Sequence, residues 1–149
     1  MQRSIKNDLV YLLRACESIG KIKIYSKGFT DSIDFFEANE QQNFNASLAL
    51  LLTIGEQISK ISDELKSKYE SIKWSDIRNF RNRLAHDYTG IDKFITYEII
   101  ENDLTVLQDN IHTIIEAEVI AGNFDVKELI AAKGNQYYRH VDFNNLPEL

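Results

Sequence analysis

The sequence predicts an all-α protein, an antiparallel bundle of four or five main helices. Apolar residues recur every three or four positions through most of the chain, which is the period of a helix packed on one side. The 149 residues include one proline, at position 147, and six glycines, so few residues interrupt a helix. No segment shows the alternation typical of a half-buried strand. The length suits one domain with its own core.

The first helix is expected from Arg3 to about Ile24. Its apolar stripe repeats at helical spacing through Leu9, Leu12, Leu13, Cys16 and Ile19. Cys16 is the one cysteine, so an internal disulfide is impossible, and its place in the stripe indicates a buried thiol.

A short helix and a joint are expected next. Gly28 supplies a break, after which Thr30 or Asp31 can cap a helix that contains Phe35 and Phe36. The polar residues 39–43 that follow are expected to form a joint or the start of the next helix.

The second long helix is expected from about Asn43 to Lys68. Gly55 lies in its apolar stripe, where a glycine costs about 1 kcal/mol relative to alanine. A glycine is best explained there if another backbone comes close, so we expect tight helix packing at this point. Glu56 beside it is expected to be an exposed or interface carboxylate.

Residues 69–73 are expected to be a linker, and Trp74 with Ser75 to open a further helix, with Ser75 as the N-cap. Ile77, Phe80 and Leu84 give this helix one apolar side. It should end near Tyr88–Gly90, where Thr89 and Gly90 form a C-terminal stop.

The last part of the chain predicts one long helix and one short helix. Asp92 begins a pattern that continues or kinks through Val119 and stops at Gly122 and Asn123. Residues 125–133 are expected to form another helix. From Asn135 we expect a loosely ordered extension or a docking tail. We therefore expect a helical bundle over residues 1–122, and a C-terminal helix and extension of unknown role over residues 123–149.

Charge is unevenly distributed. The net charge is −6, but residues 66–86 hold six bases and two acids, a local balance of +4 that leaves −10 for the rest. This basic strip could attract a polyanion, contact an oppositely charged protein, or be a solvated helix face. The N-terminus lacks the apolar core of a signal peptide, and the longest apolar run, Leu48–Leu52, is too short to span a membrane. We therefore expect a cytoplasmic protein with no membrane partner.

The segment from Arg78 to Tyr88 concentrates polar chemistry. It contains three arginines, two asparagines, a histidine and a tyrosine. Histidine can act as an acid or a base near neutral pH, and the forked guanidinium of arginine suits phosphate. Around an unbroken helix, Arg81 and His86 are separated by about 140°. A ligand must therefore lie in a groove between two stripes, or two copies of the helix must meet.

Metal chemistry has little support in the sequence. It contains no paired cysteines and no histidine pair at ligand spacing, so we expect no metal site and no cofactor. His112 is expected on the surface of the last long helix, and His140 lies in the tail. Neither is assigned a function.

A family resemblance is carried by Arg81, His86 and Tyr88, which give R-x4-H-x-Y. With Gly90-Ile91-Asp92 after it, the pattern resembles the HepT-type toxins of the HEPN superfamily. Segments on either side are similar too, namely Ile54-Gly55-Glu56, Tyr69 to Trp74, and Glu101-Asn102-Asp103-Leu104. The resemblance covers roughly residues 8–121.

The resemblance implies a HEPN-like bundle that forms a homodimer through its motif helix and cleaves RNA without a metal. His86 would move a proton at the ribose 2′-hydroxyl or the leaving oxygen, and Arg81 would hold the scissile phosphate. The remaining roles fall to neighbouring residues. Asn82 would orient the phosphate or His86. Asp87 would be a solvated acid or would set the tautomer of His86. Arg78 and Arg83 would bind flanking phosphates, and Glu56 would brace Arg81.

Tyr88 has a separate implied role. Such toxins are neutralised in prokaryotic toxin–antitoxin systems of the type VII kind, in which a minimal nucleotidyltransferase antitoxin attaches AMP to the motif tyrosine. The added charge and bulk would repel RNA. By itself, Tyr88 could instead be a helix-end side chain half-buried against Leu84. The alternative function is a non-catalytic HEPN scaffold or binding subunit for a nucleotidyltransferase.

Overall fold

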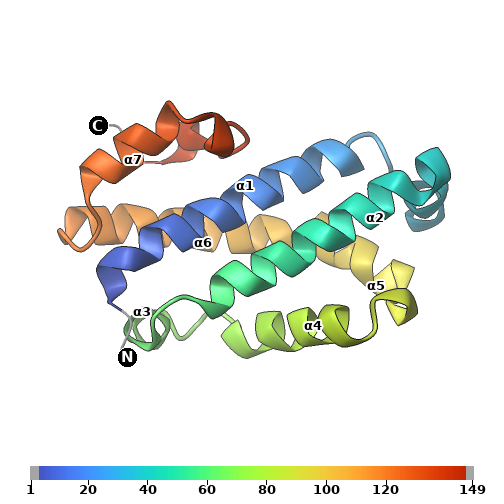
Figure 1. Ribbon diagram of the computed structural model, residues 1–149, viewed down its shortest axis with the longest axis horizontal. Coiled ribbons are helices and arrows are strands. Elements are labelled where there is room, and N and C mark those ends of the chain that lie inside the picture. Colours follow the sequence, from blue (N-terminus) through green and yellow to red (C-terminus); the bar gives the residue numbers. More distant parts are fainter. Residues whose placement is uncertain (1–3, 147–149) are drawn as a thin grey trace.

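The computed structural model describes residues 4–146, and within that range its regular structure is helical throughout (Figure 1). The predicted all-α fold class is therefore confirmed. The α-helices are α1 (Asp8–Ser26), α2 (Ser32–Ser59), α3 (Asp63–Lys68), α4 (Trp74–His86), α5 (Lys93–Glu98), α6 (Leu104–Ile120) and α7 (Val126–Lys133). A π-helical turn (Ile99–Asp103) joins α5 to α6, and short 3-10 turns occur at Ile5–Asn7, Tyr88–Gly90, Gln136–Tyr138 and Phe143–Asn145.

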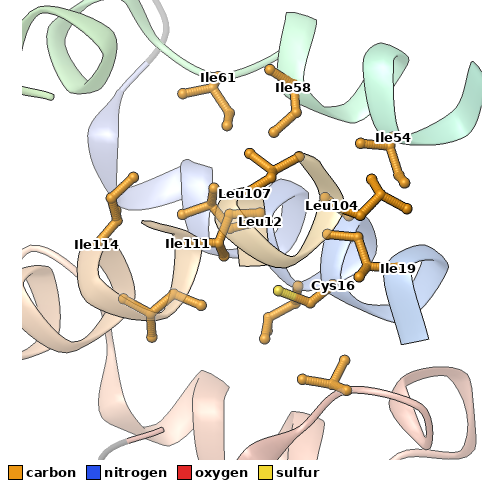
Figure 2. Close-up of a cluster of buried hydrophobic side chains, with 14 of the residues drawn as sticks. Leu12, Cys16, Ile19, Ile54, Ile58, Ile61, Leu104, Leu107, Ile111 and Ile114 are labelled. Atoms are coloured by element: carbon orange, nitrogen blue, oxygen red, sulfur yellow. The ribbon is translucent and has the colours of Figure 1, made fainter. Parts of the chain in front are cut away.

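Helices α1 and α2 form the centre of the bundle. They run antiparallel, with α6 packed on α1 and α4 packed along α2 (Figure 1). Figure 2 shows where the core sits, between the apolar sides of α1, α2 and α6. Leu12, Ile19 and Ile111 are among its fully buried side chains. No helix within residues 4–146 is long and apolar enough to cross a membrane.

The first helix ends at Ser26, close to the expected limit, but it begins only at Asp8, because residues 5–7 form a 3-10 turn. Arg3, its expected first residue, lies outside the described residues. Cys16 is fully buried, as predicted, and burial raises the pKa of its thiol to about 12.

Helix α2 contains the predicted joint. Residues 38–41 leave the helical conformation, and Asn39, Glu40 and Gln41 have φ of 52°, 58° and 66°, in the left-handed region. The short helix before this joint is capped by Asp31, whose carboxylate accepts hydrogen bonds from the N–H groups of Ile33 (2.7 Å) and Asp34 (3.2 Å).

The expected helix from Asn43 to Lys68 is wrong at its C-terminal end, because α2 stops at Ser59. Ser62 adopts an extended conformation and caps α3, accepting a hydrogen bond from the N–H of Leu65 at 3.2 Å. The buried carboxylate of Asp8 accepts two bonds from Ser62, from its N–H (3.0 Å) and its hydroxyl (2.6 Å). This contact from α1 stabilises the break.

The limits of α4 also differ from expectation. Ser75 is not the N-cap, because the helix already begins at Trp74, after Lys73, and uses no side-chain cap. Instead, the Trp74 indole N–H donates to the carbonyl of Tyr69 at 3.0 Å and fixes the linker. At the other end, α4 stops at His86 rather than near Tyr88–Gly90, because Asp87 leaves the helical region with ψ of 63°.

The C-terminal segment packs back on the bundle. In residues 135–146, Val141 and Leu146 are buried, and Glu17 of α1 accepts hydrogen bonds from the backbone N–H of His140 at 2.6 Å and binds its ring at 2.7 Å. The prediction of a loosely ordered extension is therefore wrong for these residues. Figure 1 shows α7 on the side of α1 opposite to α4.

His112 was expected on the surface, and this is wrong. It is buried, because the C-terminal segment covers this side of α6 and brings Asp142 close to it. Burial lowers the pKa of His112.

Candidate active site

Helix α4 presents the motif because its two sides differ in polarity. Leu84 is fully buried, and Ile77 and Phe80 pack half-buried against the core, so the predicted apolar side faces the bundle. Between these residues, Arg78 and Arg83 project into solvent. The helix is therefore fixed by its apolar side while its polar side stays accessible.

Arg81 lies at a close approach of α4 to α2. A Cβ built on Gly55 would be 2.7 Å from Arg81 Cγ and closer still to Arg81 Cβ, so only glycine leaves room for this side chain. The close packing predicted at Gly55 is confirmed. Glu56 also reaches the arginine, with Oε1 at 3.9 Å from Arg81 Nη2. Both side chains are about half exposed or less, so this ion pair is a weak one.

The guanidinium of Arg81 keeps donors free for a ligand. Its Nη1 donates to Asn82 Oδ1 at 3.1 Å, and its Nε is buried without a hydrogen-bond partner. An unpaired buried donor is unfavourable. The Arg81 side chain as a whole is 35% exposed, so an anion could reach the exposed part of the guanidinium but not this buried nitrogen. Arg81 is thus positioned by its neighbours yet still able to bind a phosphate.

The other basic residues of the motif have no side-chain partner among the described residues. Within residues 4–146, Arg78, Arg83 and His86 are exposed and form no side-chain hydrogen bond or ion pair. Lys68, which belongs to the basic strip in the sequence, instead binds the buried Glu118 at 3.0 Å. The positive charge available to a ligand therefore comes mainly from the arginines of α4.

Asp87 lies just beyond the helix. Its backbone N–H donates to the Arg83 carbonyl at 2.8 Å, and its carboxylate rests against Gly90, where an added Cβ would be 2.7 Å from Oδ1. Among the described residues, no hydrogen bond joins the Asp87 carboxylate to His86. The structure thus places Asp87 as an exposed acid beside the histidine.

Tyr88 folds back towards α2 in the 3-10 turn after α4. Its hydroxyl donates to the backbone carbonyl of Asn45 at 3.0 Å, and the residue is 38% exposed. Burial raises the pKa of this hydroxyl. No residue pattern predicts this contact, because the acceptor is a backbone group 43 residues away.

One hollow lies along α4 and another lies beyond its C-terminal end. An apolar groove of about 420 Å³ runs between α2, α4 and α6, and its walls include Ile54, Gly55, Ile77, Phe80 and Val106. A second hollow, of about 510 Å³, lies beside Tyr88. In the described range, no three His, Cys, Asp or Glu side chains gather closely enough to hold a metal ion.

A family model described as "Ribonuclease HepT-like" matches residues 15–114, two thirds of the chain. A protein of Methanocaldococcus jannaschii named "Gamma-glutamylcyclotransferase and putative RNase" is 32% identical over 116 residues, which are 78% of this chain and 50% of that protein. A "Probable ribonuclease HepT" of Thermococcus cleftensis is 28% identical over 110 residues, 72% of this chain and 93% of that protein. The chain therefore spans half the length of the first of these relatives. No solved structure matches significantly.

Proposed function

The chain belongs to the HepT-like ribonuclease family of the HEPN superfamily, and from this premise we propose that it is a metal-independent endoribonuclease. The observation that carries the proposal is the state of Arg81. It is held in place by Gly55 and Asn82, and its side chain is 35% exposed, on the helix that also exposes His86.

The proposed reaction needs two groups. The ribose 2′-hydroxyl loses its proton as its oxygen attacks the adjacent phosphorus. The bond to the 5′-oxygen breaks and this oxygen gains a proton, so the products are a 2′,3′-cyclic phosphate and a 5′-hydroxyl. His86 moves the proton at the attacking or the leaving oxygen. Arg81 holds the phosphate and stabilises the charge that builds on it, while Asn82 fixes the direction of the guanidinium. Arg78 and Arg83 bind neighbouring phosphates of the RNA.

A homodimer completes this site in our proposal. Helix α4 is continuous from Trp74 to His86, so Arg81 and His86 point about 140° apart. A second α4 brought alongside would let groups from both copies meet at one phosphate. The apolar groove of about 420 Å³ beside α4 supports this arrangement, because it offers the second copy a surface to bury.

We propose that Tyr88 is the point of control, through a minimal nucleotidyltransferase antitoxin that joins AMP to its hydroxyl. The exposure of Tyr88, and its position two residues after His86, support this role. The hydrogen bond to Asn45 holds the hydroxyl in one place until it is modified. The attached AMP would add negative charge beside the arginines and exclude RNA.

The second candidate is a non-catalytic scaffold for a nucleotidyltransferase. The exposed α4 face would serve a protein partner equally well, so expression without an antitoxin decides between the two. We expect growth arrest from the wild type, no arrest from Arg81→Ala or His86→Ala, and arrest retained in Arg139→Ala, an exposed arginine outside the site. A wild type that is harmless, and whose Tyr88 is unmodified by mass spectrometry, would favour the scaffold.

A further inference from the structure

The hollow beside Tyr88 is lined by aromatic rings, one cation and one acid, Asp92, whose carboxylate caps α5 by accepting hydrogen bonds from the N–H groups of Phe94 (2.7 Å) and Ile95 (3.1 Å). Phe36 and Phe44 enter it from α2, and Lys93 and Phe94 from the start of α5. Its volume of about 510 Å³ lies in the range of small-molecule sites. The motif does not use any of these four residues.

The aromatic rings of this hollow differ in how much of each ring is packed against the protein. Phe36 and Phe44 pack edge to face, with centroids 4.8 Å apart, and Phe44 is anchored in turn against the buried Phe35. Phe94 is 55% exposed, so a large part of its ring has no protein neighbour. A rigid aromatic floor with an exposed ring beside it suits a planar ligand that stacks.

Lys93 brings a positive charge to the same place. Its Nζ lies 4.8 Å from the centroid of Phe36 and 5.4 Å from that of Phe94. In the described part of the chain it pairs with no carboxylate. Its ammonium group is thus directed over the rings and can receive an anion.

Backbone strain in the wall of this hollow supports a role in ligand binding. The wall of the hollow includes Gln41, the last of three successive residues with positive φ, none of which is glycine. Backbone strain of this kind tends to occur at ligand sites.

We propose that this hollow binds one nucleotide of the RNA substrate, with its base stacked on Phe94 and its phosphate held by Lys93. Bases splayed out of single-stranded RNA are recognised by stacking on aromatic rings and by nearby cations. The inference rests on the proposed ribonuclease function, and it adds a subsite next to Tyr88. A nucleotide attached to Tyr88 would enter the same hollow and compete with the substrate.

The first test uses 5′-AMP as the probe and follows the aromatic NMR signals of the full chain. We expect shifts at Phe36, Phe94 and Tyr88, and a dissociation constant at least tenfold weaker in Phe94→Leu and in Lys93→Ala. Phe94→Tyr, which keeps the ring, should bind as the wild type does. Lys60→Ala is the matched control, because Lys60 is also a lysine over an aromatic ring but lies away from the hollow. Its Nζ is 5.9 Å from the centroid of the Tyr11 ring. Shifts that map elsewhere, or equal binding by all variants, would overturn the inference.

The second test asks whether the nucleotide that binds in the hollow belongs to an RNA or is a free mononucleotide. A 2′-O-methyl RNA oligonucleotide, which cannot be cleaved by its own 2′-oxygen, should displace AMP from the wild type. If AMP binds and this RNA does not displace it, the hollow serves a single nucleotide and the substrate assignment is wrong. Neither test needs catalysis. A chain that binds both probes here but cleaves no RNA would overturn the proposed activity alone.

Discussion

Replacing Gly55 by alanine tests the contact that positions Arg81. The new Cβ would stand 2.7 Å from Arg81 Cγ and 3.5 Å from Arg81 Cα. Unbonded carbon atoms prefer a separation of about 3.5–4.0 Å. Because Cβ is fixed to the backbone of α2, the conflict can be relieved only by moving α4 or the stem of Arg81, by about 1 Å.

The expected free-energy change combines two opposed effects. Overpacking a well-packed contact costs about 1–3 kcal/mol. Alanine regains about 1 kcal/mol, because it is the better helix former. The net loss of unfolding free energy should be about 1 kcal/mol, or roughly 2–4 °C in melting temperature for a domain of this size. A displacement of about 1 Å in a catalytic group can lower the rate by about 100-fold, so RNA cleavage should fall far more than stability.

Thermal unfolding and RNA cleavage are measured on the same preparations. Gly134→Ala is the control, since an added Cβ there meets nothing within 4 Å and its φ of −94° suits alanine. It should leave both properties near the wild-type values. If Gly55→Ala melts at or above the wild-type temperature and cleaves RNA at the wild-type rate, the close contact at Gly55 does not position Arg81.

Three further changes test other parts of the fold, each by chemical denaturation. Ser62→Ala removes the α3 cap and one partner of the buried Asp8, so the unfolding free energy should fall by about 2–3 kcal/mol. Burial by itself would raise the pKa of Glu118. The hydrogen bonds that its carboxylate accepts, of which the one from Tyr69 has the largest effect, outweigh burial and lower the pKa. The wild type should therefore lose stability as the pH falls below about 4.5, whereas Glu118→Gln should be less stable at pH 7 and show a flatter acid dependence. Glu40→Gly should not destabilise, and should gain up to about 1 kcal/mol, because φ there is 58°.

Local features of the sequence predicted the fold class and the contact at Gly55. Apolar spacing places α1, α4 and α6, and an unfavourable glycine in such a stripe indicates close packing where it is found. The caps Asp31, Asp92 and Asp125 accept hydrogen bonds from N–H groups two or three positions away, so such caps can be predicted from the local sequence.

Contacts between distant residues explain what the sequence did not predict. Ile58, Ile61 and Leu65 keep helical spacing across the break at Ser62, which depends on Asp8, 54 residues away. His112 resembles a surface residue until residues 135–146 cover it. In the site, the Tyr88 hydroxyl is directed by a backbone carbonyl of α2, which carries no sequence signal.

The central claim is that Arg81 and His86 cleave RNA without a metal, and its most direct test is cleavage of total RNA by the purified chain in EDTA, with analysis of the product ends. Wild-type protein should give discrete products that end in 2′,3′-cyclic phosphate, and His86→Ala should give none. Equal products from both proteins, or no products from a wild type whose Tyr88 is shown to be unmodified, would contradict the claim.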